Sequence, residues 1–417
     1  MILLAVLQRL FALASLAVLL LATWLLWSWY DAWHVAETLD LAAPSPALLW
    51  WGAGLMALSL LGRFPVLMLL GRAGESAPAH RGDAFQVPGA DGSVLHVERE
   101  GAAEGPILVL THGWGLSARI WAEARRDLGG RFGLVLWDLP GLGRSDRAMA
   151  YSIEGLAEDL HAVIESLPAH RPVILVGHSI GGMIVQTLCA RHPELLSTRV
   201  AGIVLENTTH TNPLETMVLS GLFRPLQPLV EAACKVETVI SPVTWLMNWQ
   251  AWLSGASHVA GRLAGFGSRP TREQLDRTVR LITANSPAVQ ARGNLAMLQW
   301  SVTGRLPGIE TPALVFVGGR DLITLDHAGE TIAAALPQAR LVRVDDAGHM
   351  GPVEKAAVYN EQIADFADFI GLLRGRSAGA ARRSFLSPDA DLAPPAAHES
   401  DEPDGAKPTG PTAPRLL

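Results

Sequence analysis

The segment from residue 172 to residue 186 constrains the fold more than any other part of the chain. It reads PVILVGHSIGGMIVQ: an unbroken apolar run is typical of a buried parallel strand, and later apolar residues recur at helical spacing. Between them lies G-H-S-I-G, with Ser179 at the apex of a sharp turn. Gly177 and Gly181 suit this turn because the chain on either side passes too close for a Cβ atom. Taken alone, the pattern also fits a glycine-rich turn with an incidental serine. Residues elsewhere in the chain are needed to distinguish a reactive serine from a structural one.

Other short apolar runs alternate with helical segments. Buried strands are expected at residues 106–111, 133–138, 173–176, 200–205, 312–317 and 340–344, with an edge strand at 93–98. Such alternation indicates a mostly parallel sheet covered by helices on both faces. The alternation stops between the fourth and fifth of these buried strands. Tryptophans, leucines and helical patches there predict a helical cap over the carboxyl edge of the sheet.

Composition divides the chain into six parts. We expect a transmembrane helical hairpin at 1–72, a linker at 73–84, an α/β core in two parts at 85–206 and 307–373, the cap at 207–306 and a disordered tail at 374–417. The tail is rich in Ala, Pro, Asp and Glu, a composition that buries too little apolar surface to fold.

The first 72 residues are more apolar than the rest. Residues 10–29 carry no charge and are long enough to cross a bilayer. Aromatic residues cluster at the far end of this run, as in an interfacial belt: Trp24, Trp27, Trp29 and Tyr30. Residues 47–70 are apolar again, interrupted by Arg63 and Pro65. A cleaved signal peptide and a soluble helix pair are alternatives, but a poor cleavage site and all-round apolarity favour a hairpin that stays in the membrane.

Charges flank this hairpin unequally. The arginines on one side are Arg9, Arg63, Arg72 and Arg81, whereas the connecting loop is acidic. The positive-inside rule then predicts a multi-pass membrane protein with both termini and the catalytic domain in the cytoplasm.

Charge and cysteine content exclude several classes of protein. The formal net charge is −7, which disfavours a nucleic-acid partner. Cys189 and Cys234 form no disulfide framework and lack the spacing of metal ligands. We therefore expect neither a metal nor a nucleic acid to bind.

A serine hydroxyl needs a base to become a nucleophile. The candidate base is His349, which lies in DAGHM just after the last expected strand, and the candidate acid is Asp321, which follows the strand before it. Parallel strands bring their carboxyl ends to one edge, so these distant residues can meet there. The order Ser179, Asp321, His349 is nucleophile, acid, base.

Each assignment has an ordinary alternative. Asp321 could begin a turn or cap a helix, and Glu206, Asp345 or Asp346 could orient the imidazole instead. His349 could be a surface residue. His112 and His178 are interpreted as structural residues that support the site, not as bases.

A tetrahedral intermediate also needs hydrogen-bond donors for its oxyanion. The candidates are the backbone N–H groups of Trp114, in the HGWG turn after a buried strand, and Ile180, which follows the nucleophile. Losing one such donor typically costs about 2.7–4 kcal/mol of transition-state stabilisation, so we expect both to be essential.

Five motifs resemble those of the α/β-hydrolase superfamily: HGWG at 112–115, WDLPGLGRSD at 137–146, GHSIGG at 177–182, GGRD at 318–321 and AGHM at 347–350. The resemblance covers roughly residues 85–373. It implies a mostly parallel eight-stranded sheet, a helical cap between strands six and seven, and no cofactor.

Departures from related families narrow the interpretation. Epoxide hydrolases and haloalkane dehalogenases carry aspartate at the nucleophile elbow, where this chain has Ser179. The H-x₄-D block of glycerolipid acyltransferases is absent, because glycines and Trp114 follow His112.

The sequence therefore predicts a membrane-anchored serine hydrolase of the esterase or lipase type. The expected substrate is a lipophilic carboxylic ester such as a monoacylglycerol, and the expected partner is the lipid bilayer. A carbon–carbon bond hydrolase, an acyltransferase and a catalytically silent membrane-bound scaffold remain alternatives. Substrate and oligomeric state are left open.

Overall fold

An eight-stranded sheet forms the centre of the molecule. The computed structural model describes residues 2–74 and 82–375. The strand order is β1-β2-β4-β3-β5-β6-β7-β8, with β1 and β2 antiparallel to their neighbours and all other pairs parallel. The predicted mostly parallel sheet is thus confirmed. The strands are β1 (Asp83–Pro88), β2 (Val94–Gly101), β3 (Ile107–Thr111), β4 (Gly133–Trp137), β5 (Val173–His178), β6 (Val200–Glu206), β7 (Ala313–Gly318) and β8 (Ala339–Val344).

The antiparallel edge of the sheet differs from the prediction. The edge strand is β1, not the segment 93–98, which belongs to β2 and pairs on both sides. β1 begins at Asp83, inside the segment expected to be a linker. Only Val87 of this strand is buried, so its sequence carries almost no apolar signal. The expected tail lies outside the described residues except for 374 and 375, which end α16 (Ala356–Gly375).

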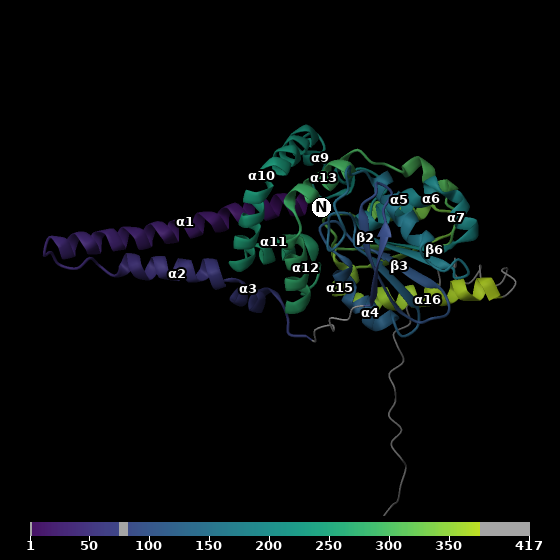
Figure 1. The fold of residues 1–417 in the computed structure, drawn as a ribbon, viewed down its shortest axis with the longest axis horizontal. Coiled ribbons are helices and arrows are strands. Elements are labelled where there is room, and N and C mark those ends of the chain that lie inside the picture. The colour runs from purple at the N-terminus through teal and green to yellow at the C-terminus, as the bar shows by residue number, and fades with distance from the viewer. Residues whose placement is uncertain (1, 75–81, 376–417) are drawn as a thin grey trace, which may run out of the picture.

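Helices cover both faces of the sheet and bury two separate apolar clusters (Figure 1). On one face lie α5 (Ile153–Glu165), α6 (Ile180–Arg191), α7 (Pro193–Thr198) and α14 (Asp326–Ala335). On the other lie η1 (Ala118–Trp121), α4 (Ala122–Leu128), α15 (Gly351–Glu354) and α16. Because β3 to β7 are buried on both faces, their sequences are apolar almost throughout, which made them easy to predict. β8 is only partly buried and carries Arg340 and Arg343.

A helical cap lies between β6 and β7. Its helices are α8 (Pro213–Thr216), α9 (Ser220–Phe223), α10 (Gln227–Leu253), α11 (Ala256–Gly265), α12 (Arg272–Ala284), α13 (Pro287–Leu298) and η2 (Thr303–Gly308). Arg277 of α12 donates to both carboxylate oxygens of Glu123 on the core, at 2.5 and 2.6 Å. Gln274 donates to the Val353 carbonyl at 2.7 Å. These buried contacts hold the cap on the sheet.

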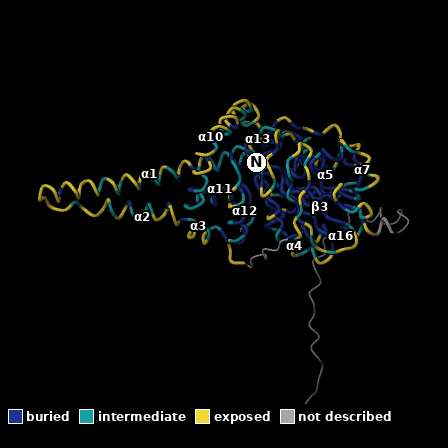
Figure 2. The backbone as a smooth tube through the Cα atoms, viewed as in Figure 1, coloured by how far each residue is buried: buried dark blue, intermediate teal, exposed yellow. Residues whose placement is uncertain are grey.

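Three N-terminal helices form an extension that projects from the body (Figure 1). They are α1 (Ile2–Thr38), α2 (Ala47–Leu61) and α3 (Arg63–Leu70). Within the described residues, α1 alone is long and apolar enough to cross a membrane. The pair α2 and α3 counts as a second span only if its 63° bend is ignored. Figure 2 shows the projecting part of the hairpin largely exposed. The structure therefore supports one candidate span and leaves the multi-pass prediction unsupported.

The beginning of α1 lies inside the body, which the sequence did not reveal. Leu4 is 6% exposed and packs in the core cluster on one face of the sheet. Arg9, expected to mark the cytoplasmic side, instead pairs with Glu237 of α10 and donates to Asn248 at 2.5 Å. Its charge is compensated within the protein and does not support the predicted orientation.

Candidate active site

Ser179 sits on a strained turn between β5 and α6. Its φ is 56° and its ψ is −119°, a conformation that costs about 1–3 kcal/mol for a residue with a side chain. A Cβ atom on Gly177 would collide with the Gly181 carbonyl, and one on Gly181 would collide with the Thr111 carbonyl. Thr208 donates its hydroxyl to the Ser179 carbonyl at 2.6 Å. This packing holds the serine at the apex that the sequence predicted.

The structure brings the three predicted catalytic side chains together. Ser179 Oγ lies 2.9 Å from His349 Nε2, and His349 Nδ1 lies 2.9 Å from Asp321 Oδ2. All three residues are at most 5% exposed. They follow β5, β8 and β7, whose carboxyl ends share one edge of the sheet. In this arrangement the His349 imidazole donates from Nδ1 to the Asp321 carboxylate, and its Nε2 can accept the Ser179 proton.

Asp321 is held as a carboxylate by a dense set of donors. Its Oδ1 accepts from the backbone N–H groups of Ile323 and Thr324 at 2.8 and 2.9 Å. Its Oδ2 accepts from the Thr324 hydroxyl at 2.6 Å and from the Asn207 amide at 3.2 Å. Burial alone would raise the pKa of Asp321, but His349 and these hydrogen bonds lower it below its ordinary value. Asp321 is therefore ionised at neutral pH, where it accepts the hydrogen bond from His349 Nδ1.

The alternative acids lie elsewhere. Asp345 pairs with Arg343, and Asp346 pairs with Lys355. Glu206 is fully buried, and neither of its carboxylate oxygens has a partner among the described residues. Burial raises the pKa of Glu206 to about 8, so this side chain is protonated at neutral pH. None of the three is in position to orient His349.

Asn207 is a supporting residue that sequence reasoning missed. Its amide donates to Asp321 Oδ2 and, at 3.1 Å, to the Gly348 carbonyl, while its own oxygen accepts from the Tyr359 hydroxyl at 2.7 Å. Asn207 has a φ of 46°, which asparagine tolerates better than most residues. The sequence could have indicated this role, because Asn207 directly follows β6 and so lies at the same edge of the sheet as the triad.

The backbone N–H groups of Trp114 and Ile180 are the predicted oxyanion donors. Among the residues that the structure describes, neither N–H donates to a backbone carbonyl, as a donor reserved for a ligand requires. Ile180 is the first residue of α6, so its N–H lies at the positive end of that helix. Gly113 allows the turn after β3 to pass close to His178, because a Cβ atom at position 113 would lie only 2.8 Å from His178 Nδ1.

The two other histidines near the site are neutral and structural, as interpreted from the sequence. His112 donates from Nδ1 to the Gly113 carbonyl at 2.8 Å and accepts at Nε2 from the Leu139 N–H. Burial lowers the pKa of His112. Burial and the neighbouring His349 lower the pKa of His178 to about 3. With Nδ1 and Nε2 engaged or buried, neither ring serves as a base for Ser179.

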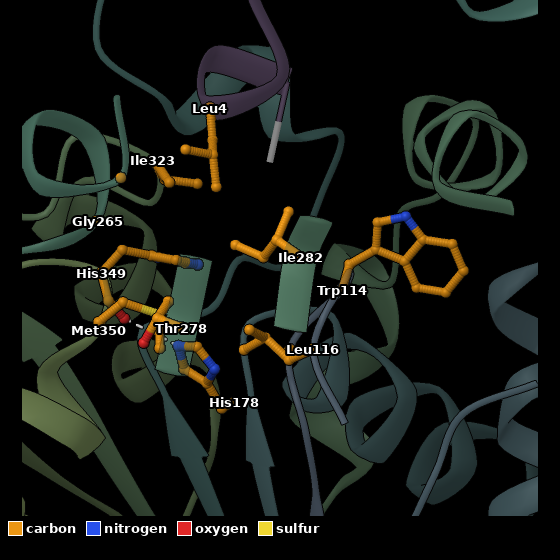
Figure 3. Close-up of a pocket in the computed structure, with 12 residues that line it drawn as sticks. Leu4, Trp114, Leu116, His178, Gly265, Thr278, Ile282, Ile323, His349 and Met350 are labelled. Atoms are coloured by element: carbon orange, nitrogen blue, oxygen red, sulfur yellow. Dashed lines mark hydrogen bonds between the residues drawn. The ribbon is translucent and has the colours of Figure 1, made fainter. Parts of the chain in front are cut away.

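A cavity of about 370 Å³, counting the open space at its mouth, is lined in part by His349 of the triad and by His178, the residue before Ser179. Its wall combines the triad edge, the cap and the first turn of α1 (Figure 3). Apolar side chains dominate the lining: Leu4, Leu116, Ile282, Ile323 and Met350. The space beside His349 is therefore suited to an apolar group.

Within the described part of the chain, one group of side chains could hold a metal ion, and it is remote from this cavity. It consists of Glu158, His161 and His192 on the outer helices. The Glu158 carboxylate is already paired with Arg191 at 2.9 Å and with His192 at 3.0 Å. These residues do not contribute to the serine site.

Comparison with known proteins identifies relatives of the same architecture. Residues 108–362 match the family described as the alpha/beta hydrolase family. A pimeloyl-[acyl-carrier protein] methyl ester esterase from Chromobacterium violaceum is 29% identical over 263 residues, covering 61% of this chain and 91% of that protein. RutD of Pseudomonas savastanoi, described as a carbamate hydrolase, is 27% identical and covers 63% of this chain and 94% of its own length.

Solved structures share the fold at lower sequence identity. An esterase from Thermogutta terrifontis superposes with a TM-score of 0.55 at 21% identity. The match covers 69% of this chain and 99% of the esterase. The N-terminal helices lie outside the family match at residues 108–362.

Proposed function

The chain belongs to the alpha/beta hydrolase family, and we propose that it is a membrane-anchored serine hydrolase that cleaves carboxylic esters through an acyl-enzyme on Ser179. Family membership and the relatives named above support hydrolase activity. The observation that carries the finer proposal is the hydrogen-bonded series Ser179–His349–Asp321, whose histidine lines an apolar cavity.

The first half of the reaction acylates the serine. His349 Nε2 takes the proton from Ser179 Oγ as that oxygen attacks the ester carbonyl carbon. Negative charge collects on the carbonyl oxygen, where the N–H groups of Trp114 and Ile180 stabilise it. The imidazolium then gives its proton to the leaving alcohol as the carbon–oxygen bond breaks. Asp321 keeps Nδ1 protonated throughout and stabilises the positive charge.

The second half restores the enzyme. A water molecule gives its proton to His349 Nε2 and attacks the acyl carbon, forming a second tetrahedral intermediate. Its collapse breaks the bond to Ser179 Oγ, which takes back the proton from the imidazolium and releases the carboxylic acid. The balance is one ester and one water consumed, with one acid and one alcohol formed.

A lipophilic acyl ester, such as a monoacylglycerol, suits the site best. Apolar side chains line the cavity, and one of them, Leu4, comes from the helix that we propose crosses the bilayer. An acyl chain buried in such a cavity gains roughly 0.8 kcal/mol per CH₂ group removed from water. A small hydrophilic acyl group would gain none of this.

A fluorophosphonate probe tests the nucleophile. We expect covalent labelling of the full-length protein and no labelling of the Ser179→Ala variant. Labelling of both would place the reactive residue elsewhere, and labelling of neither would favour a silent scaffold.

Hydrolysis of p-nitrophenyl esters of graded chain length tests the substrate. We expect kcat/KM to rise from acetate toward medium acyl chains. A clear preference for acetate would remove the argument for a lipophilic substrate. Adding an alcohol or thiol acceptor and a vinylogous diketone in parallel assays would reveal acyl transfer or carbon–carbon cleavage.

A further inference from the structure

The long cap helix α10 exposes an apolar face. Side chains on one side of this helix recur three or four residues apart and are between 45% and 79% exposed: Val236, Val239, Ile240, Val243 and Leu246. Buried residues of the same helix, such as Cys234, Thr244 and Ala251, lie outside this face. No charged residue occurs between Glu237 and Arg262. A soluble surface rarely keeps so many large apolar side chains together, so this face needs a partner.

The exposed face belongs to a helix that packs against the proposed membrane hairpin. α10 contacts both α1 and α2 and crosses α1 where the hairpin leaves the body (Figure 1). Ser15 of α1 shares a hydrogen bond with Ser254 at 2.6 Å, and its carbonyl accepts from Gln250 at 3.5 Å. Ser15 lies within the uncharged run 10–29 that is proposed to span the bilayer.

A count along α1 places this contact within the thickness of a bilayer. Ser15 precedes Trp27, in the exposed aromatic cluster at the far end of the hairpin, by twelve residues. At about 1.5 Å per residue the two are roughly 18 Å apart along the axis. The hydrocarbon core is about 30 Å thick. If the aromatic cluster marks the far interface, the end of α10 beside Ser15 lies at the depth of the near leaflet.

The two arginines at this junction have partners within the protein, as a low-dielectric setting requires of charged groups. Arg9 is neutralised by Glu237 and also donates to Asn248. The guanidinium of Arg63 lies 3.9 Å from the ring centroid of Trp252, a cation–π contact. Figure 2 shows exposed backbone continuing from the hairpin onto α10.

We propose that α10 is a second membrane contact, with its apolar face, from Val236 to Leu246, embedded in the boundary between headgroups and acyl chains of the near leaflet. The inference rests on the proposed anchoring of α1 in the same bilayer. α11 and α12 contact α10 and supply cavity residues such as Gly265 and Ile282. An embedded α10 therefore sets the cavity beside the leaflet, so that an acyl ester can enter from the lipid without crossing water.

Fluorescence quenching by lipids tests this placement in the full-length protein. Three variants carry a bimane label in phosphatidylcholine vesicles: Val239→Cys on α10, Leu20→Cys on α1 and Ser197→Cys on α7, at the other end of the body. The native cysteines are both buried, so the unlabelled parent serves as the blank. Nitroxides on the acyl chains should remove at least about half of the fluorescence at positions 20 and 239, because an interfacial helix lies about 5–10 Å deep. Position 197 should keep its fluorescence.

The outcomes separate this inference from the proposal on which it rests. Quenching at position 20 without quenching at position 239 would overturn the embedding of α10 and leave the anchor intact. No quenching at position 20 would overturn both. Disulfide-linked dimers of the unlabelled Val239→Cys variant, with no quenching of the labelled one, would show that a second copy of the chain covers this face. None of these readings depends on ester hydrolysis, so a failure of the proposed catalysis would be seen separately.

Discussion

His178 donates a hydrogen bond from Nε2 to the main-chain carbonyl of His349 at 2.8 Å. The two rings lie 5.0 Å apart, centroid to centroid, and both line the cavity (Figure 3). His178 immediately precedes Ser179, so this bond connects the turn of the proposed nucleophile directly to the loop that carries the proposed base.

Replacing His178 by alanine should therefore slow the chemical step. The His349 loop would lose one buried hydrogen bond, worth about 1–1.5 kcal/mol, which corresponds to roughly a tenfold lower kcat. KM should change by less than about twofold, because the substrate cavity keeps its apolar wall. Steady-state kinetics on a soluble ester would measure both. A kcat equal to that of the parent would show that the bond is dispensable.

Asn207→Ala should reduce both stability and turnover. Asp321 and the Gly348 carbonyl would lose a donor, and the buried Tyr359 hydroxyl would lose its acceptor. Leaving such groups unpaired costs about 1–3 kcal/mol each. Tyr359→Phe is the matched control, because it removes the hydroxyl together with its need for a partner. We expect Asn207→Ala to lower kcat and the unfolding temperature more than Tyr359→Phe does, and equal effects would contradict this role.

Glu206 should make the protein less stable as pH rises. Its pKa in the folded chain is about 8, against an ordinary value of 4.5. Between these pH values the unfolded chain has released a proton that the folded chain keeps. The free energy of unfolding therefore falls by about 1.4 kcal/mol per pH unit from this group, and the loss is complete above the folded pKa.

Glu206→Gln removes this titration. The unfolding temperature of the variant, relative to the parent, should rise between pH 5 and pH 8, as followed by near-ultraviolet circular dichroism. An unchanged difference between the two proteins at both pH values would show that Glu206 is ionised or hydrated in the folded state.

Leu4→Phe should alter acyl-chain preference. The larger ring would occupy part of the cavity, and overpacking of this kind costs about 1–3 kcal/mol. We expect kcat/KM for the longest accepted p-nitrophenyl ester to fall about tenfold, with the acetate ester little affected. Leu10→Phe is the control, because Leu10 lies on the same helix and is 58% exposed. The same loss in both variants would point to a general effect on α1.

Much of the core could be predicted because its signals are local. Strands buried on both faces are apolar almost throughout, and Ser179 and Asp321 follow two of them, β5 and β7. His349 follows β8, which is only partly buried. Parallel topology then brings Ser179, Asp321 and His349 to one edge, without any need to know how side chains pack.

The features that were missed depend on tertiary packing. β1 is mostly exposed and so carries no apolar pattern. Asn207 acts through partners on three other segments, and no motif surrounds it. Leu4 is one leucine in a helix full of them, and only the docking of α1 on the cap distinguishes it from its neighbours.

The positive φ at Ser179 makes stability and the proposed catalysis conflict at one residue: the backbone strain lowers stability, and the reaction needs the hydroxyl. Glycine would adopt the same angles without strain, so Ser179→Gly relieves the turn while deleting the reactive oxygen. Selection for stability alone would therefore favour glycine at this position and would remove the hydroxyl. A strained serine at this turn is therefore what the proposed reaction requires and what stability alone would remove.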